Sequence, residues 1–78
     1  MPTVLTVKGY RFFFYSNDHS PTHIHIEKDN AVAKFSLDPI ELLRSKRFKA
    51  DEINEIRRIV IDHVDFFKTK WNENFNIK

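Results

Sequence analysis

Residues 22–37 read Thr22-His23-Ile24-His25-Ile26-Glu27-Lys28-Asp29-Asn30-Ala31-Val32-Ala33-Lys34-Phe35-Ser36-Leu37. Successive side chains of a strand point to opposite faces of a sheet, and most of this stretch alternates apolar with polar residues. Asp29-Asn30 has the composition of a two-residue hairpin loop. That loop gives the pairs Lys28 with Ala31, Ile26 with Ala33, His25 with Lys34, Ile24 with Phe35 and His23 with Ser36. The sequence therefore predicts a hairpin with one apolar face and one polar face that carries the histidines.

Other strands are predicted on both sides of this hairpin. Thr3–Val7 and Tyr10–Tyr15 are β-prone runs separated by the turn signal Lys8-Gly9, and they predict an opening hairpin. The turn-forming residues from Ser16 to Pro21 predict a loop. After Asp38-Pro39, residues 40–43 fit either a short fifth strand or one helical turn, and we favour the strand.

The C-terminal third has a helical pattern from Asp51 to about Asn72. The apolar residues that recur there at three- and four-residue spacing are Ile53, Ile56, Val60, Val64, Phe67 and Trp71. The sequence thus predicts an α+β fold of four or five short, mostly antiparallel strands (about 3–43), followed by one long C-terminal helix (about 51–72) packed on the sheet. We expect one domain over residues 1–78, with a tail after Asn72.

Composition narrows the classes of function. The 78 residues contain no cysteine, which excludes disulfides, thiolate metal sites and thiol catalysis. The start, Met1-Pro2-Thr3-Val4, resembles neither a signal peptide nor a membrane anchor, so we expect a cytoplasmic protein without membrane contact. Net charge is +2, and the one basic cluster, residues 44–49, is expected to be solvated loop surface.

Three of the four histidines, His19, His23 and His25, lie within seven residues, next to Asp18 and Glu27. The first reading is metal-independent acid–base cleavage of RNA, with His23 and His25 as the base–acid pair and Lys34 stabilising the phosphoryl charge. The second is a metal site in which His19 or Asp18 completes a set with His23 and His25. Because Lys34 would oppose a cation, we expect no stoichiometric metal, and we expect no other cofactor.

A third reading involves no chemistry. Half-exposed polar residues on a strand usually do none, and the same face could instead dock a partner protein. The aromatic residues 12–15 also have two sides to cover. Phe12 and Phe14 point to one face of the strand, and Phe13 and Tyr15 point to the other. One set is expected to meet the helix, and the other a partner or stacked bases. His63 is interpreted as a satisfied residue on the helix surface.

Five segments of the sequence together resemble one known family. They are Met1-Pro2-Thr3-Val4-Leu5, Gly9 to Ser16, Asp18 to Lys28, Ala33 to Pro39, and the helix end Trp71-Asn72. The family that they resemble is the bacterial domain-of-unknown-function family 4160. The family's Pro-Pro-His-x-His-Val reads Pro21-Thr22-His23-Ile24-His25-Ile26 here, with Thr22 in place of the second proline.

The resemblance implies a small bacterial protein encoded beside another small protein, in a toxin–antitoxin-like module. The implied roles are a toxin that acts on RNA, or the binding partner of such a toxin. The expected partners are therefore a small protein encoded nearby and RNA, and self-association is left open. The predicted site is the surface of His19, His23, His25 and Lys34, acting on nucleic acid or docking a partner.

Overall fold

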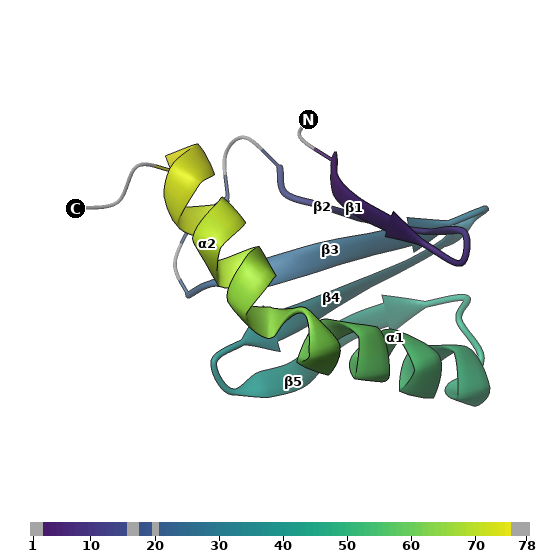
Figure 1. Ribbon diagram of the computed structural model, residues 1–78. Coiled ribbons are helices and arrows are strands. Elements are labelled where there is room, and N and C mark those ends of the chain that lie inside the picture. Colours follow the sequence, from purple (N-terminus) through teal and green to yellow (C-terminus); the bar gives the residue numbers. More distant parts are fainter. Residues whose placement is uncertain (1–2, 16–17, 20, 76–78) are drawn as a thin grey trace.

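The computed structural model describes residues 3–15, 18–19 and 21–75, which form five strands and two helices (Figure 1). The strands are β1 (Thr3–Val7), β2 (Tyr10–Phe13), β3 (His23–Lys28), β4 (Ala31–Leu37) and β5 (Ile40–Lys46). The helices are α1 (Ala50–Asp62) and α2 (Val64–Phe75). The strands pair in chain order, and each pair is antiparallel. The predicted α+β class is confirmed.

The predicted register of the central hairpin is also confirmed. His23 pairs with Ser36, His25 with Lys34 and Lys28 with Ala31, on either side of the two-residue turn. The opening hairpin turns at Lys8 and Gly9, both of which have positive φ, and glycine adopts that conformation without strain. The predicted loop from Ser16 to Pro21 is described only at Asp18, His19 and Pro21, whereas Met1-Pro2 and the last three residues of the predicted tail lie outside the described residues.

Residues 40–46 form the strand β5, as favoured, and they extend beyond the predicted end at residue 43. The pairing of β5 with β4 slips by one residue, because Lys34 lies opposite Arg44 whereas Phe35 lies opposite Leu42. Leu43 is therefore the extra residue of a β-bulge. Beyond the bulge, Arg44 and Lys46 project to the same face as Lys34.

The prediction of one long C-terminal helix is wrong, because α1 and α2 are separated at His63. Its backbone angles, φ −120° and ψ 18°, are not helical. The ring Nδ1–H of His63 donates to the carbonyl of Ile59 at 2.9 Å, and its backbone N–H also points at that carbonyl, at 3.1 Å. A side chain that enters the backbone ladder in this way kinks a helix. The kink lets α1 contact β5 while α2 crosses to β4 (Figure 1).

The two helices pack against one face of the sheet, the covered face (Figure 1). Phe12 of β2 is fully buried and stacks on Phe67 of α2, with ring centroids 5.3 Å apart. Phe14 meets Trp71 edge to face at the same distance. Ile24 and Ile26 of β3 are also fully buried in this core. The apolar side of the predicted hairpin is therefore the side that the helices cover.

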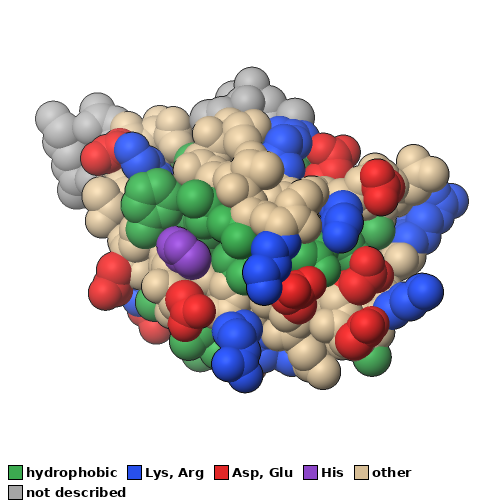
Figure 2. Space-filling view, turned by 45° about the vertical axis from the view of Figure 1, so that its right-hand side comes forward, with side chains coloured by type: hydrophobic (Ala, Val, Ile, Leu, Met, Phe, Trp, Pro, Cys, Tyr) green, Lys and Arg blue, Asp and Glu red, His purple; other side chains and the backbone are tan. Residues whose placement is uncertain are grey.

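The opposite face of the sheet, the open face, carries no helix from the described residues. Neither α1 nor α2 combines the length and apolar composition that crossing a membrane requires, so far as residues 3–15, 18–19 and 21–75 show. On the side of the molecule drawn in Figure 2, acidic and basic side chains are intermixed around a hydrophobic strip. The open face has a different charge pattern, and the candidate site lies there.

Candidate functional site on the open face

A row of four directly opposed residues crosses the open face. Phe13 of β2 lies opposite His25 of β3, His25 lies opposite Lys34 of β4, and Lys34 lies opposite Arg44 of β5. Opposed residues in a sheet point to the same side, so their side chains form one continuous surface. The regular pairing of the meander thus brings together residues that are more than 30 positions apart in the chain.

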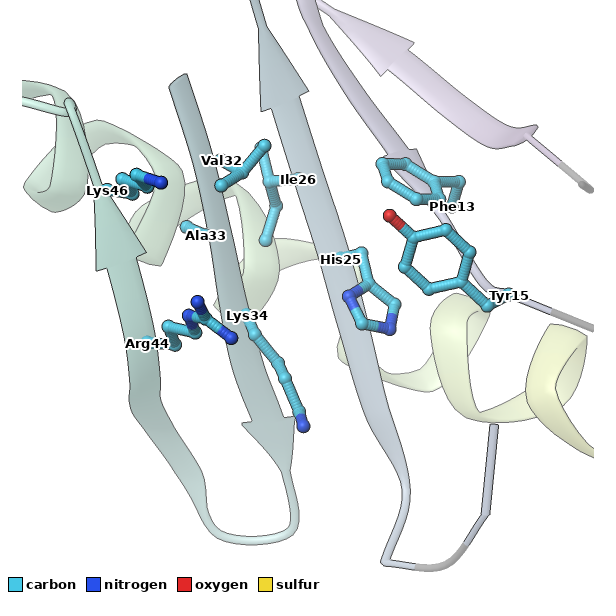
Figure 3. Close-up of a pocket in the computed structure, with 9 residues that line it drawn as sticks. All are labelled: Phe13, Tyr15, His25, Ile26, Val32, Ala33, Lys34, Arg44 and Lys46. Atoms are coloured by element: carbon cyan, nitrogen blue, oxygen red, sulfur yellow. The ribbon is translucent and has the colours of Figure 1, made fainter. Parts of the chain in front are cut away.

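This row runs through a hollow of about 310 Å³. Basic side chains of β4 and β5 lie on one side of it, and His25 and the rings of Phe13 and Tyr15 lie on the other (Figure 3). Lys46 completes the basic side. The hollow therefore combines positive charge with aromatic surface.

The basic side consists of Lys34, Arg44 and Lys46, which we call the basic triad. None of the three makes an ion pair with another described residue. Like charges directly opposite each other, as Lys34 and Arg44 are, destabilise a sheet. The expectation that residues 44–49 are loop surface is wrong for Arg44 and Lys46, because both belong to β5. The alternation of Arg44 and Lys46 was the signal in the sequence that could have revealed this.

The aromatic side is held together by stacked rings. The guanidinium of Arg11 lies 4.1 Å above the ring of Phe13, which also stacks on the ring of His25 at 5.5 Å. The ring of Tyr15 meets His25 edge to face at 4.5 Å. Phe13 is buried by these contacts, whereas Tyr15 remains 44% exposed. Tyr15 is therefore the ring of this side that offers most surface to a ligand.

The two strand histidines converge on one carboxylate. We call Asp18, His23 and His25 the Asp18 cluster, because one ligand-type atom from each lies within 4.8 Å of the others. Nε2 of His25 lies 3.2 Å from both carboxylate oxygens of Asp18, and the backbone N–H of Tyr15 donates to Oδ2 of Asp18 at 2.9 Å. The carboxylate is thus held on two sides.

His23 is buried, in contrast to the half-exposed position expected from the alternation. It is 6% exposed, and its ring lies 5.0 Å from that of Trp71 and 5.0 Å from that of His25. Its Nδ1–H donates to the carbonyl of Pro21 at 2.8 Å. Its Nε2 lies 3.2 Å from Oδ1 of Asp18, but the geometry does not make a hydrogen bond, and this buried atom has no hydrogen-bond partner among the described residues.

The surroundings shift two ionisation equilibria in the cluster. Burial lowers the pKa of His25 and favours its neutral form; Asp18 opposes this shift, whereas His23 and Lys34 add to it. Burial acts to raise the pKa of Asp18, but the hydrogen bonds from the Tyr15 N–H and from His25 outweigh it, so that this pKa is lowered. Asp18 is therefore an anion beside a neutral His25 at neutral pH.

The structure assembles part of the predicted site. His23, His25 and Lys34 lie together as predicted, whereas His19 is exposed and does not belong to the Asp18 cluster. Asp18 takes the third position. The ring of His63 is hydrogen-bonded to the backbone carbonyl of Ile59, which agrees with its interpretation from the sequence as a satisfied residue. Sequence reasoning missed Arg44 and Lys46 as parts of the hollow.

A family model described as "Domain of unknown function (DUF4160)" matches residues 9–72. The chain belongs to this family. The matched segment of the DUF4160 chain contains the whole Asp18 cluster and the basic triad. Comparison with curated proteins and with solved structures gave no significant match.

Proposed function

We propose that the open face binds single-stranded RNA in the hollow between the basic triad and Tyr15. The observation that carries this proposal is the pair Lys34 and Arg44, two cations held directly opposite each other without an acidic partner among the described residues. An RNA phosphate would offset their repulsion. Aromatic surface beside a basic groove is the usual combination in proteins that bind single strands, since the rings stack on bases while the cations follow the backbone.

The geometry supports binding better than cleavage by a histidine pair. A base–acid pair must reach two sides of the reacting phosphate, but the Nε2 atoms of His23 and His25 both lie 3.2 Å from the carboxylate of Asp18. A phosphate between them would meet the carboxylate, which repels it. His23 is also too buried to contact a substrate on the surface of the sheet. Lys34, by contrast, lines the hollow and fits the predicted role of a phosphate contact.

The test is binding of a labelled single-stranded RNA of mixed sequence, measured by fluorescence anisotropy over a range of salt concentrations. Changing Lys34, Arg44 and Lys46 together to alanine should lower the log–log salt slope by about 2, since each single-strand phosphate contact contributes roughly 0.7. Tyr15→Ala should weaken binding on the order of 10-fold through lost stacking.

The matched control changes three helix cations, Arg58, Lys68 and Lys70, to alanine, so that net charge falls by the same amount. Its salt slope should stay close to that of the native chain. Equal losses in the two triple variants would mean that the attraction is diffuse, and no binding by the native chain would refute the proposal. Gel analysis of the same samples at several pH values would reveal cleavage.

A second candidate is docking of a partner protein on the same face. The observation in its favour is that Tyr15 and Val32, two apolar linings of the hollow, are 44% and 37% exposed. Exposed apolar residues beside charged ones are typical of binding surfaces for proteins. In that case Tyr15→Ala and Val32→Ala would weaken a partner complex while RNA binding is absent from the native chain.

We further place the protein in the bacterial cytoplasm as one member of a toxin–antitoxin-like module. This part of the proposal is supported by the family resemblance alone. Expression of this chain by itself should stop growth if it is the toxin, and the triple change at Lys34, Arg44 and Lys46 should relieve the arrest. If the native chain does not affect growth, the antitoxin role is the one that remains. Co-expression with the small protein encoded nearby tests that role.

A further inference from the structure

The Asp18 cluster contains a buried lone pair that has no hydrogen-bond partner among the described residues. Because a carbonyl oxygen only accepts hydrogen bonds, the contact of His23 with Pro21 requires the proton of the neutral ring to lie on Nδ1. Nε2 then carries a lone pair, and it lies 3.2 Å from Oδ1 of Asp18. Two acceptors at this distance repel each other, and the buried nitrogen has no hydrogen-bond partner in residues 3–15, 18–19 and 21–75.

A cation between Nε2 of His23 and Oδ1 of Asp18 would remove the repulsion between these two acceptors. The geometry indicates whether that cation is a proton or a metal ion. A proton on Nε2 would have to point at Oδ1, but the two atoms are not aligned for a hydrogen bond. A metal ion needs the lone pair directed at itself, with the carboxylate oxygen beside that axis. A tetrahedral ion with bonds of about 2.0–2.1 Å holds its ligand atoms roughly 3.3 Å apart. Oδ1 of Asp18 lies 3.2 Å from Nε2 of His23 and 3.2 Å from Nε2 of His25, and the three ligand atoms all lie within 4.8 Å of one another.

The residues around the cluster hold it in the arrangement that ligands require. A histidine that binds a metal usually donates its other ring N–H to a carbonyl or carboxylate, which fixes the ring. His23 makes this contact with Pro21. The backbone N–H of Tyr15 holds the carboxylate of Asp18, and β3 fixes the spacing of the two histidines.

We propose that Asp18, His23 and His25 bind a divalent transition-metal ion of the zinc class. The carboxylate and both Nε2 atoms are the ligands, and the proton now shared between His25 and Asp18 moves to Nδ1 of His25 on binding. Two imidazoles and one carboxylate suit zinc and its neighbours, and leave a further coordination position open. The site does not depend on RNA binding, although His25 lines the hollow as well.

A metal ion at the Asp18 cluster differs from the expectation drawn from the sequence, in which Lys34 near His25 opposes a cation and no stoichiometric metal is bound. The sequence left open whether Asp18 or His19 completes the set. The structure brings the Asp18 carboxylate into it, and its negative charge offsets the effect of Lys34 on a bound cation.

The test uses the untagged chain after treatment with a chelator and dialysis, without RNA. Calorimetric titration with Zn²⁺ should show one ion per chain. Co²⁺ should give the visible absorption bands of a low-symmetry site and should quench the fluorescence of Trp71, the chain's only tryptophan, whose ring lies 5.0 Å from His23. A titration without heat or quenching would overturn the proposal and would favour an ion pair between a protonated His23 and Asp18.

Single substitutions test which residues are the ligands of the metal ion. His25→Ala and Asp18→Asn should each lower Zn²⁺ affinity by more than the ~10–100-fold that loss of an outer contact costs. Neither removes a residue of the apolar core, and circular dichroism checks the fold of each. The matched control is His19→Ala, which removes an exposed neighbouring imidazole and should leave affinity unchanged. Loss of binding in His19→Ala, or undiminished binding in His25→Ala, would overturn the assignment of ligands.

Discussion

The two sides of strand β3 are shielded from water to different degrees and by different means. Ile24 and Ile26 point to the covered face and are completely enclosed by aromatic and aliphatic side chains of the core. His23 and His25 alternate with them; His23 is buried and His25 is partly buried, beside Asp18 and other rings. Apolar groups need only exclusion from water, whereas buried polar groups need specific partners. Apolar burial on the covered face therefore stabilises the fold, whereas the open face carries polar groups to which a ligand could bind.

Removal of a ring from the covered face gives the strongest test of this contrast. Phe12→Ala should reduce the free energy of unfolding by about 3–5 kcal/mol, because Phe12 is fully buried against Phe67. Tyr15→Ala on the open face should cost less than about 1 kcal/mol, since Tyr15 is largely exposed. Urea denaturation measures both values. Similar losses in the two variants would show that the open face contributes to stability as much as the core does.

His23→Ala tests whether a polar residue can also support the fold. Because His23 is packed against Trp71, its removal should cost about 1–3 kcal/mol in the presence of a chelator. This differs from the half-exposed position expected from the sequence, at which loss of the side chain would barely disturb folding. His19→Ala is the matched control and should change stability by no more than about 0.5 kcal/mol. Equal effects would place His23 at the surface.

The smallest expected effect on stability comes from a polar group on the covered face that has a hydrogen-bond partner, the hydroxyl of Tyr10. The hydroxyl of Tyr10 donates to Glu55 at 2.8 Å, and burial together with this bond raises the pKa of Tyr10 to about 12. A raised pKa in the folded state stabilises the protein below the unfolded value of 10, and this contribution is lost as pH rises toward 12.

Tyr10→Phe should therefore cost about 1 kcal/mol at neutral pH. The difference between native and variant chains should shrink above pH 10, as urea denaturation at a series of pH values would show. Tyr15→Phe serves as the control. A difference that stays constant to pH 12 would contradict the assigned role of the bond between Tyr10 and Glu55.

Local patterns in the sequence were sufficient for most of the sheet. Period-two alternation and the Asp29-Asn30 loop fixed the pairing of β3 with β4, and thereby placed His25 opposite Lys34. The glycine in the first turn located the opening hairpin. These features depend on neighbours in the chain, and the strand order follows the chain as well.

Features that depend on distant contacts were not predictable in the same way. The apolar stripe from Ile53 to Trp71 continues without a proline or glycine, so the break at His63 had no signal in the residue spacing. The path of α2 after that break brings Trp71 onto His23 and buries it. The spacing of residues in the sequence also could not show whether Asp18 or His19 is the third member of the cluster, because both lie in the same predicted loop.

The bulge at Leu43 has a consequence for how this surface can vary between related chains. With the pairing of Phe35 and Leu42 kept, a regular ladder would place Leu43 opposite Lys34 and would turn Arg44 and Lys46 to the covered face. Deletion of Leu43 would remove the bulge and leave Arg44 opposite Lys34, whereas insertion of one more residue at this position, paired regularly, would reverse the facing of every later residue of β5. The number of residues at this position, more than their identity, thus decides which face receives these two positive charges.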